Sequence, residues 1–415
     1  MAVAPSNAPP ARPLSRVVVL SVVVAALGYF VDIYDLLLFS IVRVTSLRSL
    51  GVQGDQLLVA GERLLNMQMT GMLIGGLLWG VLCDRRGRLS VLFGSIFLYS
   101  AANLANAWVQ SVEAYAWLRF VAGIGLAGEL GAGITLVSEI LPKETRGYGT
   151  TIVAATGILG AVAAALVGDR FDWRTSYIVG GVMGFALLAL RIGVYESGMF
   201  ESVRQTGSTR GNVLQLFNRW DRFRKYAAVI LIGVPIWYVI GILITFSPEI
   251  GLALGMAEPP AAGRAVMFAY LGLAGGDFAS GFLSQFIGSR RRVVLLFQLL
   301  TATFVATYFL FAPFSLRGFY TLCVALGFGV GYWAVFVTVA SEQFGTNIRA
   351  TATTTVPNVV RGSVVLLTSS IGWLRPQVGI VNSALIVGAV TLLIAVVALT
   401  GLEETYGKEL DYVEE

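Results

Sequence analysis

The sequence predicts an all-α membrane protein with twelve transmembrane helices arranged as two pseudo-symmetric bundles of six. Three observations lead to this fold class. The 415-residue chain is 56% apolar and only 13% charged, whereas soluble domains are roughly 25% charged. Apolar stretches of about 20 residues, the length that spans a bilayer, recur throughout. Two short motifs also appear at matching positions in each half of the chain.

This composition excludes an ordinary cytoplasmic enzyme, a disordered protein and a nucleic-acid binder. The net charge of +5 is assigned to membrane topology, because basic residues gather in cytoplasmic loops. The chain has no histidine, which excludes histidine-based triads and the common zinc motifs. It also has no Walker motif, so ATP-driven transport is not expected. We therefore expect no enzyme activity, no cofactor and no bound metal.

The twelve spans follow from hydropathy, taken in chain order. The first is too long for a signal-peptide core and lacks a cleavage site, so we expect it to remain in the protein. The predicted spans are 17–42, 62–82, 90–108, 113–138, 148–168, 175–195, 227–247, 264–286, 293–312, 318–340, 350–372 and 380–401.

A polar, basic segment divides the spans into six and six. We predict an N-terminal bundle over 1–195, a cytoplasmic linker over 196–226, and a C-terminal bundle with a short tail over 227–415. GVLCDRRG from Gly80 is repeated in weaker form as GFLSQFIG from Gly281, each after the second span of its half. Parallel repeats of this kind are common in secondary transporters.

With twelve spans, both termini lie on the same side of the membrane. The loops on that side carry more Lys and Arg residues than the loops on the opposite side. Both termini are therefore predicted to be cytoplasmic. We expect a multi-pass monomer in the bacterial cytoplasmic (inner) membrane, with the lipid bilayer, protons and a small-molecule substrate as its partners and no nucleic acid.

The segment GVLCDRRGRLSVL resembles the loop signature of the major facilitator superfamily, and RFVAGIGLAGE resembles the fourth-helix signature of its proton-coupled members. SEILPKETRG and SEQFGTNIRA resemble the signatures after helices four and ten. The resemblance covers nearly the whole chain. It implies two bundles that rock around a central site, with proton-coupled metabolite symporters and organic anion transporters as the nearest types.

The resemblance also implies a cytoplasmic latch between the bundles. The plain alternative is that these charges only set topology. Gln285 stands where the first copy has Asp84, which predicts a one-sided latch. The predicted gating residues are Gly80, Asp84, Arg85, Gly87, Arg88, Glu139, Arg146, Glu342 and Arg349. Glycines at four-residue spacing, such as Gly71 with Gly75 and Gly272 with Gly276, further predict close packing where the bundles slide.

Six ionisable residues lie inside the predicted spans and away from their ends, where each charge costs at least ~2.5–3.5 kcal/mol to insert. Function is the default interpretation of such residues. They are Asp32, Asp35, Arg119, Glu129, Asp277 and Arg361.

Asp35 and Arg119 lie at similar depth, each ~10 Å from the outer boundary, and so are expected to meet. Asp32 lies one turn below Asp35 and is expected on the same face. Two carboxylates in a site of low dielectric favour retaining a proton. The pair also matches the helix-one acid and helix-four arginine that couple protons in sugar porters. The alternative is a static ion pair between two helices.

Glu129 lies near the midplane within GLAGELGAG and completes the predicted proton-coupling set. The alternative is a permanently protonated carboxyl bonded to neighbouring backbone.

Arg361 lies ~18 Å into helix eleven and cannot shed its charge. Its planar fork suits a carboxylate, supplied either by the protein or by a substrate. The segment from Thr346 to Gly362 resembles organic anion transporters, in which the corresponding arginine is implicated in anion binding. The alternative is a permanent pair with Asp277. Asn358 and Asp277 join Arg361 in the predicted substrate-binding set.

Four aromatic residues near mid-depth are predicted to line the cavity and stack on a flat substrate. The alternative is ordinary helix packing. They are Trp237, Tyr238, Tyr332 and Trp333.

The six buried residues comprise four acids and two arginines, so full ionisation would leave two negative charges inside. Either protons accompany an anion or the substrate is a cation. We predict a secondary active transporter that carries a small organic anion, a mono- or aromatic carboxylate, in symport with protons. The alternative is an organic cation or drug transporter, working by uptake or proton antiport, with the buried acids as counter-ions.

Overall fold

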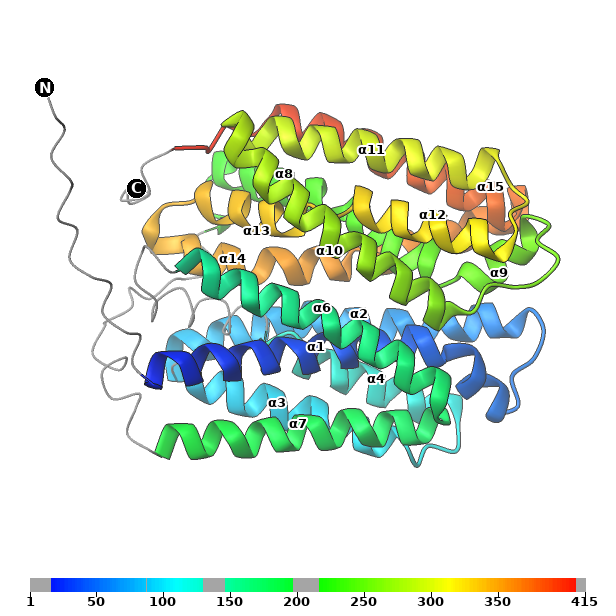
Figure 1. Ribbon diagram of the computed structural model, residues 1–415, viewed down its shortest axis with the longest axis horizontal. Coiled ribbons are helices and arrows are strands. Elements are labelled where there is room, and N and C mark those ends of the chain that lie inside the picture. Colours follow the sequence, from blue (N-terminus) through cyan, green and yellow to red (C-terminus); the bar gives the residue numbers. More distant parts are fainter. Residues whose placement is uncertain (1–15, 87, 130–145, 197–215, 408–415) are drawn as a thin grey trace, which may run out of the picture.

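The computed structural model describes residues 16–86, 88–129, 146–196 and 216–407, and every regular element in these ranges is helical. Six helices form the lower group in Figure 1. They are α1 (Arg16–Ser49), α2 (Gln56–Arg86), α3 (Arg88–Asn106), α4 (Val112–Leu126), α6 (Arg146–Arg170) and α7 (Trp173–Glu196).

The second group lies above the first, with most helices running along the same direction (Figure 1). Its elements are α8 (Trp220–Tyr238), the π-helix η2 (Val239–Ile244), α9 (Ser247–Ala253), α10 (Ala262–Ile287), α11 (Arg290–Leu310), α12 (Leu316–Gly329), α13 (Trp333–Glu342), α14 (Thr346–Gly362) and α15 (Val364–Thr400). We call the face where α1 begins and α15 ends the near face, and the face where α1 ends the far face. The predicted linker 196–226 falls largely on residues 197–215, outside the described ranges.

Within the described residues, seven helical segments are long and apolar enough to cross a membrane. Helices satisfy all their backbone groups internally, which is why they are the form in which such apolar sequence crosses a bilayer. The fold class predicted from the sequence is confirmed.

Three of the predicted spans are interrupted, and the expectation of continuous helices there was wrong. Span seven passes from α8 into the π-turn of η2, just after Pro235 inside α8. Span ten breaks between Gly329 and Trp333, and span eleven breaks at Ser363. Hydropathy does not detect such breaks, because apolar residues continue through them. Each break leaves backbone groups outside the regular helical ladder.

Gly71 and Gly272 pack within their own bundles, whereas Gly76 of α2 faces Asn358 of α14 across the two bundles, so the expectation of close packing between bundles holds for only part of the stripe. A Cβ built on Gly71 would lie 2.1 Å from the Phe120 carbonyl oxygen of α4, and one on Gly272 would lie 2.0 Å from that of Val324 in α12. These positions therefore require glycine because two helices of the same bundle touch backbone to backbone.

Polar contacts join the two groups of helices near the far face. Arg43 of α1 pairs with Glu249 of α9 at 2.6 Å, and Glu62 of α2 pairs with Arg375 of α15 at 2.9 Å. The Thr245 hydroxyl also donates to the Ser40 hydroxyl at 3.1 Å. The two groups are thus closed against each other on this side.

Candidate functional site

Arg361 forms the centre of a buried cluster between the two groups of helices. Its side chain is 1% exposed, and its Nη2 lies 3.9 Å from Oδ2 of Asp32 in α1. Its guanidinium carbon lies 5.9 Å from the ring centroid of Trp237 and 5.8 Å from that of Trp333. The structure thus brings together four of the residues singled out in the sequence, from three helices of one group and one of the other.

This cluster has unused hydrogen-bonding capacity. Within the described part of the chain, Nε and Nη1 of Arg361 and both carboxylate oxygens of Asp32 are buried without a hydrogen-bond partner. A guanidinium carries five N–H donors, and buried donors are normally satisfied. Donors on a cation between two indole rings suit a ligand with acceptor oxygens and a flat apolar body.

The helix breaks gather around this cluster. α14 ends at Gly362, directly after Arg361, while α13 begins at Trp333 and η2 begins two residues after Trp237. Discontinuous helices near the membrane midplane commonly form the binding sites of secondary transporters, because they offer free backbone groups there.

Two tyrosines near the cluster escaped the sequence analysis. The indole of Trp333 is within hydrogen-bonding reach of the Tyr29 hydroxyl, and both Tyr29 and Tyr270 lie in electrostatic range of Arg361 and Asp32. Tyr29 lies one turn before Asp32 on α1, so helical spacing from a known buried acid was the signal that could have identified it.

Asp32 and Asp35, one turn apart on α1, have different nearest neighbours, although Asp32 lies within electrostatic range of Asp35. Asp32 faces Arg361, whereas Asp35 packs so closely on α7 that a Cβ on Gly180 would lie 2.3 Å from its Oδ1. Arg119 lies within electrostatic range of Asp35. Its Nη2 donates to Asn103, and its guanidinium lies over the Tyr177 ring, so it is held inside the first group.

Glu129 forms a two-pronged ion pair with Arg191 of α7. Nη1 of Arg191 donates to Oε2 at 3.1 Å, and Nη2 contacts Oε1. The alternative of a carboxyl bonded only to backbone was therefore wrong. The sequence analysis set Arg191 aside, although it lies within the predicted sixth span and therefore also needed a partner.

Asp277 and Asn358 bond mainly to backbone. Asp277 accepts from the backbone N–H of Ala334 at 3.1 Å, in the first turn of α13. The alternative of an Arg361–Asp277 pair was wrong, because Arg361 pairs with Asp32. The Asn358 amide donates across the two groups to the carbonyl of Ala127 at 3.0 Å, a carbonyl that lies just past the end of α4.

Tyr238 and Tyr332 direct their hydroxyls to backbone within the second group. Tyr238 donates to the Ala384 carbonyl at 2.7 Å, and Tyr332 donates to the Ile232 carbonyl at 2.9 Å. Both are fully buried, and neither hydroxyl points to the Arg361 cluster.

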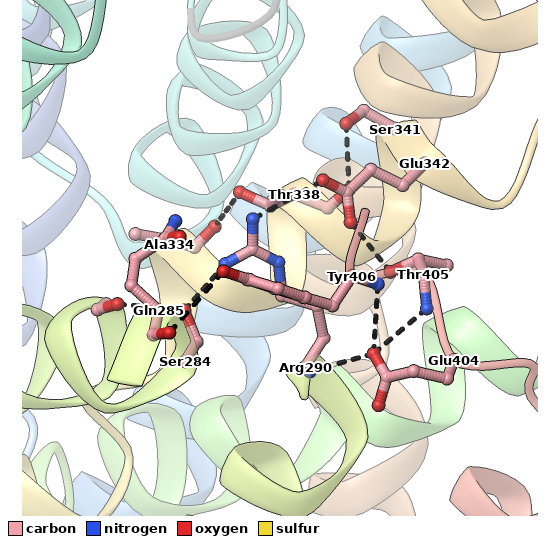
Figure 2. A network of polar contacts seen from close by, with 11 residues as sticks. Ser284, Gln285, Arg290, Ala334, Thr338, Ser341, Glu342, Glu404, Thr405 and Tyr406 are labelled. Carbon is pink, nitrogen blue, oxygen red and sulfur yellow. Dashed lines mark hydrogen bonds and ion pairs between the residues drawn. The ribbon is translucent and has the colours of Figure 1, made fainter. Parts of the chain in front are cut away.

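Glu342, one of the two predicted gating residues of the second group, belongs to a near-face network (Figure 2). Glu342 lies 3.5 Å from Arg290 and accepts from Thr405 at 2.7 Å. Partial burial acts to raise the pKa of the Glu404 carboxyl, but hydrogen bonds from Ser289 and from backbone N–H groups outweigh it and lower that pKa. Arg349 donates separately to the Phe344 carbonyl at 3.2 Å.

Most of the predicted gating residues of the first group lie outside the part of the chain that the structure describes. Gly80 lies in α2 with open space where a side chain would be. Gly87 and Glu139 lie outside the described residues, as do the side chains of Asp84, Arg85, Arg88 and Arg146.

Comparison with known proteins decides the family. The sequence pattern of the Major Facilitator Superfamily matches residues 18–366, most of the chain. The chain belongs to the Major Facilitator Superfamily. The crystal structure of a D-xylose–proton symporter resembles it with a TM-score of 0.69 at 16% identity, covering 94% of this chain and 99% of that one. At that identity the likeness confirms the superfamily fold.

Among curated members of the superfamily, the "Putative niacin/nicotinamide transporter NiaP" of Bacillus subtilis is 27% identical, over 80% of this chain and 82% of its own. The 3-(3-hydroxy-phenyl)propionate transporter of Escherichia coli is 29% identical, over 70% of this chain and 72% of its own. These relatives are transporters and not enzymes. The chain is a multi-pass membrane transporter, as the sequence predicted.

Proposed function

We propose that the protein carries a small organic carboxylate in symport with protons, by alternating access between its two helix bundles. The observation that carries the proposal is the buried Arg361 guanidinium, which lies 5.9 Å and 5.8 Å from the ring centroids of Trp237 and Trp333 and, among the described residues, has one acid partner, at 3.9 Å. A planar carboxylate would fill the unused donors, and an attached ring would stack between the indoles.

Asp32 gives the site a means of linking substrate to proton. A substrate carboxylate on Arg361 would compete with Asp32, which then has no cation at 3.9 Å to balance its charge. A proton neutralises a carboxyl that has lost its counter-ion in a buried site. Asp35, with Arg119 nearby, is the proposed proton carrier within the first bundle. Glu129 is kept as the remaining member of the proposed proton-coupling set.

The names of the relatives favour the same substrate class. Niacin and 3-(3-hydroxy-phenyl)propionate, which appear in the names of two relatives, are aromatic carboxylic acids, while the first name also includes nicotinamide, the neutral amide of niacin.

The membrane setting and the gate are part of the proposal. The near face is assigned to the cytoplasm of a bacterial cell and the far face to the outside, with the protein acting as a monomer. The bundles are 1–195 and 227–415. The near-face loops then form the latch, to which Glu342 contributes through Arg290 in the second bundle.

The alternative, organic cation transport, loses part of its support. It depended on two surplus negative charges among the buried residues. Arg191, which pairs with Glu129, adds a third arginine to the four acids and two arginines of the predicted spans, so one surplus negative charge remains in that set.

Uptake into proteoliposomes tests the proposal. Nicotinate, benzoate, 3-(3-hydroxyphenyl)propionate and the cation tetraethylammonium would be offered with and without an inward proton gradient. We expect a carboxylate to accumulate only with the gradient. Asp35→Asn should abolish that accumulation and leave counterflow exchange intact. Asp169 is an exposed acid on α6, and Asp169→Asn should leave both accumulation and exchange intact. Gradient-driven uptake of the cation alone would contradict the proposal.

A further inference from the structure

A second arginine, Arg43 near the far face, is as buried as Arg361 and also incompletely bonded. Its side chain is 0% exposed. Its Nη2 contacts Glu249 at 2.6 Å and the Thr245 carbonyl at 3.4 Å. Within the described residues, its Nε and Nη1 have no hydrogen-bond partner. Three of the five donors of this guanidinium are therefore unused.

The surroundings of Arg43 form a built site at the seam between the bundles. Its guanidinium carbon lies 4.6 Å from the ring centroid of Phe246. On the other side it packs against α2, where a Cβ on Gly61 would lie 2.7 Å from Nη1. The hydroxyl of Ser247, next to Phe246, is also buried without a partner. The site thus combines a cation from α1 with an aromatic ring from the start of α9, next to which lies a residue with an unpartnered hydroxyl.

The two partners of the ion pair differ in how firmly they are held. Arg43 is enclosed by α1 and α2 of the first bundle, while Glu249 belongs to the seven-residue helix α9 of the second and is 19% exposed. When the bundles separate on the far face, Glu249 leaves with its own bundle. Arg43 then faces the opening without its carboxylate, and a buried cation demands a replacement.

We propose that Arg43 is a second carboxylate site, at which an aromatic acid arriving from the far face binds before it reaches Arg361. Glu249 is the internal stand-in for the carboxylate of that acid. It occupies the guanidinium when the far face is closed and gives it up when the face opens. This inference rests on the proposed function, since it assumes a carboxylate substrate.

The structure supplies a matched control in the other far-face ion pair. Glu62 and Arg375 also join the bundles, but their side chains are 14% and 25% exposed, and no ring stacks on Arg375 among the described residues. A change that merely loosens closure of the far face should act alike at both pairs. A change that frees a carboxylate site should act only at Arg43 and Glu249.

The test is the concentration of benzoate that half-saturates initial uptake into cells expressing the full-length protein, which presents the far face outward. Glu249→Gln should lower that concentration about tenfold, because the competing charge is removed. Arg43→Lys should raise it about tenfold, because a point charge replaces the fork. Glu62→Gln should leave it within about twofold, since Glu62 makes its direct contact with Arg375, which is 25% exposed, and not with Arg43. Benzamide, which lacks the charge, should not compete in any variant.

Tighter binding in Glu249→Gln cannot result from misfolding, so this arm decides the matter even if Arg43 variants fold poorly. An unchanged or raised half-saturating concentration in Glu249→Gln would refute the site. Equal effects of Glu62→Gln and Glu249→Gln, or effects on the maximal rate alone, would show that the pair is only a latch. If the unaltered protein takes up no carboxylate but accumulates a cation, the proposed function fails first, and the Arg43 site fails with it.

Discussion

Two buried ion pairs in this transporter are built in opposite ways. Glu129 and Arg191 meet through two contacts, within one bundle. Asp32 and Arg361 meet at a single distance of 3.9 Å across the two bundles, with donors and acceptors left over on both sides.

The difference separates a fixed element of the fold from an exchangeable one. A charge buried with full pairing is costly to disturb, because removing one partner leaves the other without compensation. A charge with unused donors already lacks part of that compensation and gains from a ligand that supplies it. Rocking of the bundles also changes the second pair and leaves the first intact. The first pair therefore holds α4 and α7 together, and the second belongs to the transport cycle.

The largest expected effect comes from breaking the fixed pair. Glu129→Gln should lower the free energy of unfolding by about 3–5 kcal/mol, because Arg191 stays buried without its counter-charge. Thermal or denaturant unfolding of the purified protein in detergent would measure it. Asp32→Asn is the matched control, with an expected change below about 1 kcal/mol, since neither Asp32 oxygen accepts a hydrogen bond within the described residues and the contact with Arg361 is 3.9 Å long. Equal losses in both variants would remove the distinction.

The exchangeable pair should respond in binding instead. Arg361→Lys should weaken equilibrium binding of benzoate by about 10- to 100-fold, or about 1.4–2.8 kcal/mol, because a point charge replaces a two-pronged donor. Arg290→Lys, an arginine of the near-face network in the same bundle, should leave the affinity unchanged. Loss of affinity in Arg290→Lys alone would place the binding site elsewhere.

Asp277 offers a smaller test, because its carboxylate bonds to backbone rather than to a cation. It accepts from Ala334 at the start of α13 and so acts as a cap supplied by α10. Asp277→Ala should cost about 1 kcal/mol of unfolding free energy, typical of a lost cap. A much larger loss of benzoate affinity than of stability would instead give Asp277 a direct role in binding.

How far the sequence predicted this site depends on the kind of inference. Depth counted along helices placed Arg361, Trp237 and Trp333 at a similar level and in one predicted substrate-binding set, because the rise per residue is fixed. The partner of Arg361 was not predictable in this way. Asp32 and Asp35 lie one turn apart on α1, and their directions differ slightly. As a result Asp32 contacts Arg361 of the other bundle, whereas Asp35 contacts α7 of its own bundle.

Hydropathy alone also did not predict the helix breaks. The residues of η2, Val239–Ile244, are as apolar as those of a regular helix, and only packing decides that they form a π-turn. Arg43 was assigned to an outer loop, because apolar residues become sparse at Val42. The helix continues to Ser49, and Arg43 within it pairs with Glu249 of the other bundle.

The smallest expected effect is at an exposed acid that caps α7. Hydrogen bonds from the Thr175 hydroxyl, together with backbone N–H groups of Thr175 and Arg174, hold the pKa of Asp172 below its usual value. A lowered pKa means that the stabilisation is present above the ordinary value and is lost as the pH falls through the lowered one. Asp172→Ala should therefore cost about 0.5–1 kcal/mol at pH ~7.

Unfolding of the Asp172→Ala variant and the unaltered protein would be followed from pH ~7 to ~3. Their difference should shrink toward the acid end, as Asp172 takes up its proton. A difference that stays constant over this range would show that hydrogen bonds to the ionised carboxylate are not its cause.

The central claim, that a carboxylate and a proton cross together, is tested most directly by recording pH. Proteoliposomes in weakly buffered medium with valinomycin and potassium on both sides would receive benzoate, with external pH followed over time. The account predicts an immediate rise in external pH as protons enter with the substrate, and no rise in Asp35→Asn. Benzoate uptake with no pH change, or with acidification of the medium, would contradict it.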